Sequence, residues 1–103
     1  MRVIKLKYLR DFWIGHADAE PGLRKWAAEC LKARWRNFED VKAYARSADY
    51  VGNNRVVFNI CGNKYRLVVA IHYRTGIVLV KAIITHAEYD KIDVKTVEIG
   101  DVL

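Results

Sequence analysis

The chain has 103 residues, 52% of them hydrophobic, which suits a single domain, residues 1–103, with a modest core and leaves no room for a second. Eighteen lysines and arginines against twelve acidic residues give a net charge of +6, which favours a polyanionic partner such as a nucleic acid. Cys30 and Cys61 have neither metal-site spacing nor a disulfide-dense context, and the sequence contains no signal-peptide core and no apolar run of roughly 18 residues. We therefore expect reduced cysteines and a cytoplasmic protein that does not enter a membrane.

Two helices are predicted in the first half of the chain. A short strand around Arg2 to Ile4 is followed by apolar residues at helical spacing over about Lys5 to Ile14, with Gly15 at the end. Asp18 or Ala19 is expected to cap a second helix, which begins at Glu20-Pro21. Its narrow apolar stripe consists of Leu23, Ala27, Cys30 and Leu31.

The rest of the chain reads as strands after one short helical segment. Residues Asn37 to Tyr44 predict one or two capped helical turns, and Ser47 to Asn54 predict a loop whose glycine and asparagines turn into the next strand. From Val56 to Thr85 the sequence alternates with period two and is rich in β-branched residues, which predicts an antiparallel meander. We expect an α+β fold in which the two N-terminal helices cover one face of this sheet.

Turn lengths decide which side chains of the meander share a face. A two-residue Gly62-Asn63 loop pairs Cys61 with Lys64 and Asn59 with Arg66. In the next hairpin a two-residue Thr75-Gly76 loop would place Arg66 opposite Thr85 and turn His86 away from it. A three-residue loop from Arg74 to Gly76 would instead pair Arg66 with Ile84 and Lys64 with His86.

We favour the three-residue loop because it brings apolar residues together on the face that the helices cover. The pairs in question are Leu67 with Ile83, Ile71 with Leu79, and Tyr73 with Ile77. In this register Lys81 lies opposite Val69 on the apolar side, so either its amine snorkels to the edge or the register is wrong.

The favoured register gathers residues suited to cutting RNA without a metal. The reaction needs a base for the 2′-hydroxyl, cations for the charged phosphate and an acid for the departing 5′-oxygen. Lys64 or His86 would serve as base, Arg66 would hold the phosphate, and His86 or Tyr89 would serve as acid. Neighbouring cations are expected to lower the pKa of both Lys64 and His86. Asn59 lies beside them, and Arg34, Arg36 and Lys91 are further candidates for contacts with RNA.

Each of these residues also has an ordinary structural explanation. Lys64 flanks a hairpin, Arg66 is a surface arginine, His86 caps a helical turn and Tyr89 belongs to the core; only their combination on adjacent strands of a basic domain indicates a site. His16 and His72 have no comparable partners, whereas Trp35, between two arginines, is a candidate for contact with a partner. No phosphate-binding glycine loop, zinc ligand set or nucleophile elbow is present, so we expect no cofactor and no metal.

Two motifs carry a resemblance to a known family. The segment Asn53-Asn-Arg-Val-Val-Phe-Asn-Ile-Cys-Gly-Asn-Lys-Tyr-Arg-Leu-Val-Val69, followed by Thr85-His-Ala-Glu-Tyr-Asp90, resembles the HigB toxins, mRNA interferases of type II toxin–antitoxin systems. The resemblance extends from the Met1-Arg-Val-Ile start to Asp93, and the tail from Val94 to Leu103 lies beyond it. The matching site positions are Asn59, Lys64, Arg66, His86 and Tyr89.

The resemblance implies a RelE-like fold with a short C-terminal helical turn. It also implies cleavage of mRNA, usually on translating ribosomes, until a helix-turn-helix antitoxin of the HigA type neutralises the toxin; operator DNA would be contacted only through the antitoxin complex. A second hypothesis is a non-catalytic RNA- or ribosome-binding module that uses the same basic surface. A third is an interaction subunit whose apolar sheet face binds a partner.

Overall fold

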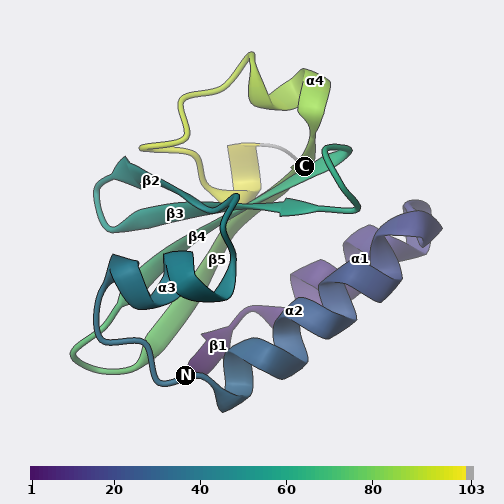
Figure 1. Ribbon diagram of the computed structural model, residues 1–103. Helices are drawn as coiled ribbons and strands as arrows, with labels where there is room; N and C mark the ends of the chain where they lie inside the picture. Colours follow the sequence, from purple (N-terminus) through teal and green to yellow (C-terminus); the bar gives the residue numbers. More distant parts are fainter. Residues whose placement is uncertain (102–103) are drawn as a thin grey trace.

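A five-stranded sheet forms the centre of the protein, of which the computed structural model describes residues 1–101. The order of strands across the sheet is β1-β5-β4-β3-β2 (Figure 1). The strands are β1 (Arg2–Ile4), β2 (Asp49–Gly52), β3 (Arg55–Ile60), β4 (Tyr65–His72) and β5 (Ile77–Thr85). Within residues 1–101, β1 and β5 are the one parallel pair; every other neighbouring pair is antiparallel, which confirms the predicted meander.

Two helices cover one face of the sheet, and this confirms the predicted α+β architecture. Helix α1 (Leu6–Gly15) is joined to α2 (Glu20–Lys32) by a short 3-10 turn, η1 (Ala17–Ala19), and both helices lie below the sheet in Figure 1. Their buried side chains are Leu9, Leu23, Trp26 and Cys30. Trp26 takes the place predicted for Leu31, which is 53% exposed, because residues 23, 26 and 30 follow one side of the helix. None of the helices in the described residues is long and apolar enough to span a bilayer.

The segment after α2 departs from the sequence analysis in one respect. Helix α3 (Phe38–Tyr44) is capped as predicted, since the Asn37 side chain accepts a hydrogen bond of 3.0 Å from the Asp40 amide. Trp35, however, is only 6% exposed and packs on Phe58 of the sheet, with 6.2 Å between ring centroids. Trp35 therefore packs in the core, which leaves little of its surface for the contact with a partner that the sequence suggested.

The predicted loop from Ser47 to Asn54 contains an additional strand. Residues Asp49–Gly52 form β2, which pairs with β3 at the edge of the sheet, and Asn53 and Asn54 make the turn with φ angles of 53° and 59°. Asparagine tolerates this left-handed conformation better than most residues, which explains why the turn could be predicted from the sequence. The short strand before the turn was not predicted.

The register predicted for the β4–β5 hairpin is correct at one end and wrong at the other. At the end near the β3–β4 turn the strands pair as predicted, with Arg66 opposite Ile84 and Leu67 opposite Ile83. At the turn His72 pairs with Ile77, so the loop has four residues, and a β-bulge at Lys81 absorbs the difference. The pairs Ile71–Leu79 and Tyr73–Ile77 are therefore wrong. Lys81 does not oppose Val69; its amine lies 3.1 Å from the Glu98 carboxylate, on the face opposite the helices.

The C-terminal segment covers part of that second face. After α4 (His86–Tyr89) the chain runs back above the sheet in Figure 1 to the turn η2 (Ile99–Asp101). It contributes Val97 to an apolar cluster with sheet residues Val57, Val68, Ala82 and Ile84. Arg55, 4% exposed, holds the segment by donating hydrogen bonds to the carbonyls of Val94 and Val97 and pairing with Glu98 at 3.2 Å.

Candidate active site

Three strand ends bring polar side chains together on the second face of the sheet. Asn59 of β3 lies directly opposite Arg66 of β4, as the Gly62-Asn63 turn predicted, and Arg66 in turn lies opposite Ile84 of β5. The His86 amide donates a 3.0 Å hydrogen bond to the Lys64 carbonyl, which extends the β4–β5 ladder into α4. Arg66 and His86 therefore meet at one end of the sheet.

Helix α4 is fixed at its start by a capping box. The Thr85 hydroxyl accepts a hydrogen bond from the Glu88 amide at 3.2 Å, and the Glu88 carboxylate accepts one from the Thr85 amide at 3.1 Å. The cap is Thr85, so the alternative explanation of His86 as a helix cap does not hold. His86 instead points an exposed ring into solvent beside Arg66.

The Arg66 guanidinium connects the members of the site. One nitrogen, Nη1, donates to the Asn63 carbonyl at 3.0 Å, and the other, Nη2, lies 3.5 Å from Nδ1 of His86. Because a guanidinium can only donate, Nδ1 acts as the acceptor in this contact. The guanidinium carbon also lies 5.8 Å from the centre of the Tyr89 ring, within the range of a cation–ring contact.

Tyr89 has one side in the apolar cluster of the second face and the other toward Arg66. Its ring is partly buried against the sheet and the C-terminal segment. Burial, followed by the charge of Asp49, raises the pKa of its hydroxyl, and the Arg66 charge only partly opposes this. The phenol therefore stays protonated and is equipped to donate a proton or a hydrogen bond.

The Lys64 side chain does not join this group, because it pairs with Asp18 on the helix side of the sheet. Its ammonium forms an ion pair with the Asp18 carboxylate in η1, and Asp18 also accepts a 2.6 Å hydrogen bond from the Tyr65 hydroxyl. The bond to Asp18 raises the pKa of Lys64, so the prediction that neighbouring cations lower it is wrong. As placed here, Lys64 is a poor base, because it is held charged by a carboxylate 46 residues away in the chain.

The predicted RNA contacts divide between the two ends of the protein. Asn59 lies in the site, its amide 3.3 Å from Asn63 Oδ1, and Lys91 is exposed shortly after α4. Arg34 and Arg36 lie instead beside the β4–β5 turn, at the far end of the sheet. His72 lies six positions beyond Arg66 along β4, which at roughly 3.3 Å per residue is about 20 Å.

Asp18 and Thr85 also organise the site, although neither was predicted to do so. Thr85 and Glu88 have the spacing of a capping box, so that signal was present in the sequence. Asp18 had none, since its role depends on a contact between distant segments.

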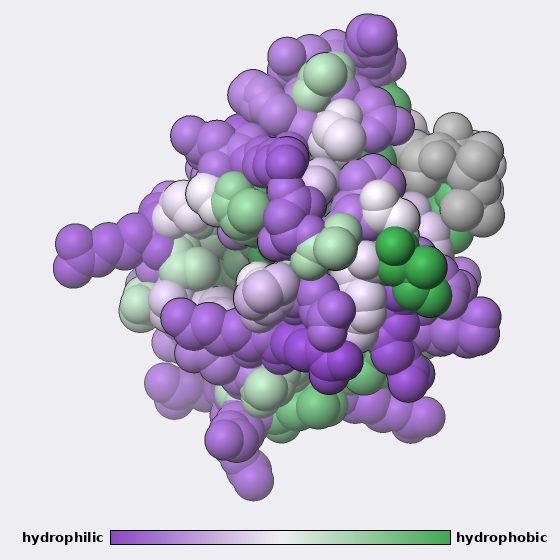
Figure 2. Space-filling model, turned by 90° about the vertical axis from the view of Figure 1, so that its right-hand side faces the viewer, coloured by the Kyte–Doolittle hydropathy of each residue, from purple (hydrophilic) through white to green (hydrophobic). Residues whose placement is uncertain are grey.

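The end of the protein that carries the site is suited to a polar ligand. Figure 2 shows this end, with the β3–β4 turn and α4, as a predominantly hydrophilic surface with scattered apolar patches. Across residues 1–101, no three histidine, cysteine or acidic side chains are grouped so that they could hold a metal ion. The groups that the site offers are a guanidinium, an imidazole, a phenol and an amide.

One family of known proteins matches most of the chain. Residues 19–92 match the family described as HigB toxin, a RelE-like toxic component of a toxin–antitoxin system. The match covers more than half of the chain and includes Asn59, Lys64, Arg66, His86 and Tyr89. A search of individually curated proteins gave no match.

Proposed function

Because the chain belongs to the HigB family of RelE-like toxins and acts as the toxin of a toxin–antitoxin system, we propose that it is a metal-independent endoribonuclease that cuts mRNA. The observation that carries the proposal is the contact of Arg66 with both His86 and Tyr89 at one hydrophilic end of the sheet. A cation that binds phosphate thus lies beside two groups that exchange protons, which is the set needed for phosphodiester cleavage.

In the proposed reaction the 2′-hydroxyl oxygen of one nucleotide attacks the adjacent phosphorus. His86 takes the proton of that hydroxyl, the bond from phosphorus to the 5′-oxygen breaks, and Tyr89 gives its proton to the departing oxygen. The products are a 2′,3′-cyclic phosphate and a 5′-hydroxyl end. Arg66 binds the nonbridging oxygens as their charge grows, and its departure from Nδ1 of His86 frees that nitrogen to accept the proton.

Lys64 is assigned a different part in this scheme. Its ion pair with Asp18 keeps it charged on the helix side of the sheet, so it is not the base and acts on RNA only if a bound strand displaces Asp18. Asn59, opposite Arg66, supplies an amide for a ribose or base edge.

Family membership implies an antitoxin partner, and we propose one of the HigA type with a helix-turn-helix domain. We further propose that the message is cut while it is being translated. In this arrangement operator DNA is contacted by the antitoxin, and the toxin reaches it only as part of the complex.

The test compares His86→Ala and Arg66→Ala with an exposed control, Arg10→Ala, which lies on α1 away from the site. Loss of a proton-transfer group lowers cleavage about 10²- to 10⁴-fold, and loss of a preorganised charge about 10²- to 10³-fold. Purified proteins are incubated with mRNA, with and without ribosomes, and the ends are mapped; growth on induction is followed in parallel. If both site variants cut as well as the Arg10→Ala control, the assignment of the active site is wrong.

One observation favours a second candidate, a non-catalytic RNA-binding module. Arg34 and Arg36 lie at the end of the sheet remote from His86 and need no acid or base to bind RNA. This candidate requires that Arg34→Glu abolishes toxicity while His86→Ala has no effect, whereas the endoribonuclease loses toxicity with His86→Ala.

A further inference from the structure

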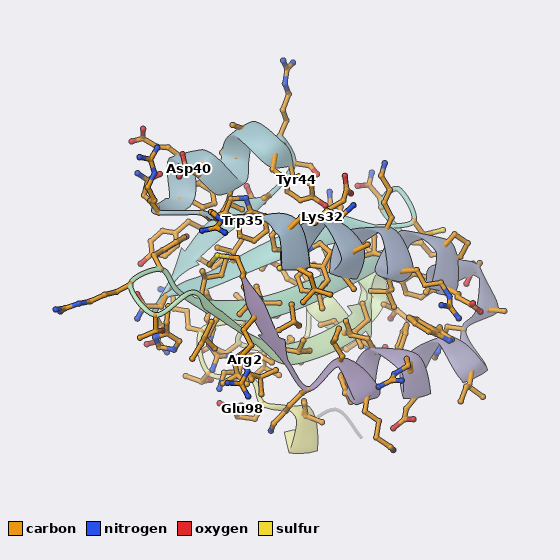
Figure 3. The ribbon with its side chains drawn as sticks, turned by 90° about the horizontal axis from the view of Figure 1, so that it is seen from below. Arg2, Lys32, Trp35, Asp40, Tyr44 and Glu98 are labelled. Carbon is orange, nitrogen blue, oxygen red and sulfur yellow. The ribbon has the colours of Figure 1, made fainter. Side chains whose placement is uncertain are left out.

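A basic hollow of about 600 Å³ lies at the end of the protein opposite the candidate active site. Four cationic side chains border it, those of Lys32, Arg34, Arg36 and Arg74, and the name "basic hollow" refers to these residues and the space between them. Figure 3 shows two residues of its wall, Lys32 at the end of α2 and Trp35 beside it, with Asp40 of α3 beyond Trp35.

The fold builds this hollow from two segments that are distant in sequence. Helix α2 ends at Lys32, where Ala33 adopts an extended conformation (φ −72°, ψ 154°) and leads the chain across to α3. The other wall is the four-residue turn of the β4–β5 hairpin, where Gly76 has a φ of 72°. The Gly76 carbonyl accepts a 2.7 Å hydrogen bond from the Arg2 amide, which ties this turn to β1.

The charge of the hollow is almost uncompensated. In the described part of the chain no acidic residue lines it, and Asp40, just outside it, lies 3.5 Å from Nε of Arg36. Within residues 1–101, Lys32, Arg34 and Arg74 form no ion pair, whereas other basic side chains such as Lys7 and Arg24 pair with a carboxylate one helical turn away. Like charges kept close together without counter-charges favour binding of an anion that neutralises several of them at once.

We propose that the basic hollow binds phosphates of an RNA backbone at a place separate from the bond that is cut. Three arginines offer planar forks that match phosphate oxygens, and Tyr73 provides a partly exposed ring at the same wall. The inference rests on the proposal that the protein acts on RNA, and it adds that RNA is held at two points about 20 Å apart. At roughly 3.4 Å per nucleotide, a stacked strand of about four nucleotides spans about 14 Å, which is less than this separation.

The bound phosphates come either from a distant part of the message or from ribosomal RNA. Both sources present the same chemistry to the hollow, and both predict that short RNA is bound at the active site alone. Guanidinium forks match carboxylates as well as phosphates, so binding of an acidic stretch of the antitoxin is the alternative that the test below must exclude.

The test compares Arg34→Glu/Arg74→Glu with a control of equal charge change, Arg10→Glu/Arg46→Glu. All four positions are exposed, and neither control residue lines the hollow. Binding is measured by fluorescence anisotropy at several salt concentrations, with His86→Ala present in every protein to prevent cutting. Labelled RNAs of about four and about 30 nucleotides serve as probes, since each phosphate contact on a single strand contributes about −0.7 to the slope of log K against log salt.

For the longer RNA, we expect the slope of the hollow variant to be shallower than that of the control by about 1.4, which corresponds to two lost contacts. For the shorter RNA the two should agree. Because the readout is binding, it stands even if the protein proves not to cut RNA. Equal slopes for the hollow variant and the control on the longer RNA, together with equal sedimentation with ribosomes, would overturn the inference.

Sedimentation with ribosomes separates the two sources. If the hollow variant binds the longer RNA like the control but no longer sediments with ribosomes, the phosphates belong to ribosomal RNA; loss of binding to free RNA assigns them to the message. Either result supports the inference. If the hollow variant keeps all RNA binding and loses only the antitoxin, the hollow is a protein-binding site and the inference is wrong.

Discussion

Replacing Arg55 by methionine tests how the C-terminal segment is attached to the sheet. The Arg55 side chain is buried, and its Nη1 donates to the carbonyls of Val94 and Val97 while its Nη2 pairs with Glu98. Methionine keeps a long unbranched stem and removes all three interactions without opening a large cavity. The substitution therefore isolates the polar attachment from the packing beneath it.

The expected loss of stability has a lower and an upper limit set by the contacts. Each buried carbonyl left without a donor costs about 1–3 kcal/mol, so the two together cost about 2–6 kcal/mol. The higher values are not reached if the C-terminal segment detaches, because water then hydrates the two carbonyls. The main loss is then the burial of the Val97 side chain, about 1.5–3 kcal/mol. The ion pair adds little, because Glu98 is 52% exposed and also pairs with Lys81. We expect Arg55→Met to lower the free energy of unfolding by about 3 kcal/mol.

Urea unfolding measures this change, and hydrogen exchange locates it. The amides of Thr96 and Val97 are bonded to the Asp93 carbonyl at 3.2 and 3.0 Å, and they should exchange faster in the variant than amides of β3 and β4. Lys81→Met is the matched control, since it removes a second partner of Glu98 but leaves the carbonyl bonds, and it should cost under about 1 kcal/mol. An Arg55→Met protein that unfolds like the control, with unchanged exchange at Thr96 and Val97, would refute this account of the attachment.

Three further predictions concern the site itself. Thr85→Val removes the cap of α4, so stability should fall by about 1 kcal/mol in urea melts and RNA cleavage should fall with it; full activity would show that α4 needs no cap to place His86. Tyr89→Phe keeps the ring against Arg66 and removes the hydroxyl, so unfolding should change by less than about 1 kcal/mol while cleavage drops about 10²-fold or more, and unchanged cleavage would remove Tyr89 as the acid. The bonds from Lys64 and Tyr65 hold the pKa of Asp18 below its ordinary value of 3.8, so their contribution to stability is present above pH 3.8 and is lost as the pH falls through the lower folded-state value. Asp18→Asn should therefore be less stable than the parent at neutral pH and match it in strong acid, and a difference that persists in acid would point to packing as its origin.

The parts of the site that sequence predicted correctly are those fixed by local geometry. The Gly62-Asn63 turn determines that Asn59 faces Arg66, because a hairpin loop of known length sets the pairing on both sides of it. The pairing of Arg66 with Ile84 was also correct, although the loop length assumed for it was not. Alternation of apolar residues near the site constrained the register more strongly than the turn did.

The parts that sequence did not predict depend on contacts between distant segments. Lys64 was assigned to the site from its position beside the turn, but its side chain forms an ion pair with Asp18 on the helix side of the sheet. Trp35 looked available between two arginines, yet it is buried because α3 folds over it toward Phe58. The C-terminal segment carries no periodic pattern, and its place is decided by the buried Arg55.

The bulge at Lys81 lies between the two ends of β5 and bears on how far the length of the β4–β5 turn can vary in such a toxin. Val80 faces the helix-side core and Ala82 the second face, so side chains alternate regularly along β5 when Lys81 is left out. Lys81 is therefore the extra residue of the bulge. A change in the length of the distant hairpin turn can be taken up at this point, where the ladder already contains one unpaired position. Insertions and deletions at the hairpin turn then leave the distance between His86 and Arg66 unchanged. The end of the sheet that borders the basic hollow can therefore diverge while the end with the candidate active site stays fixed.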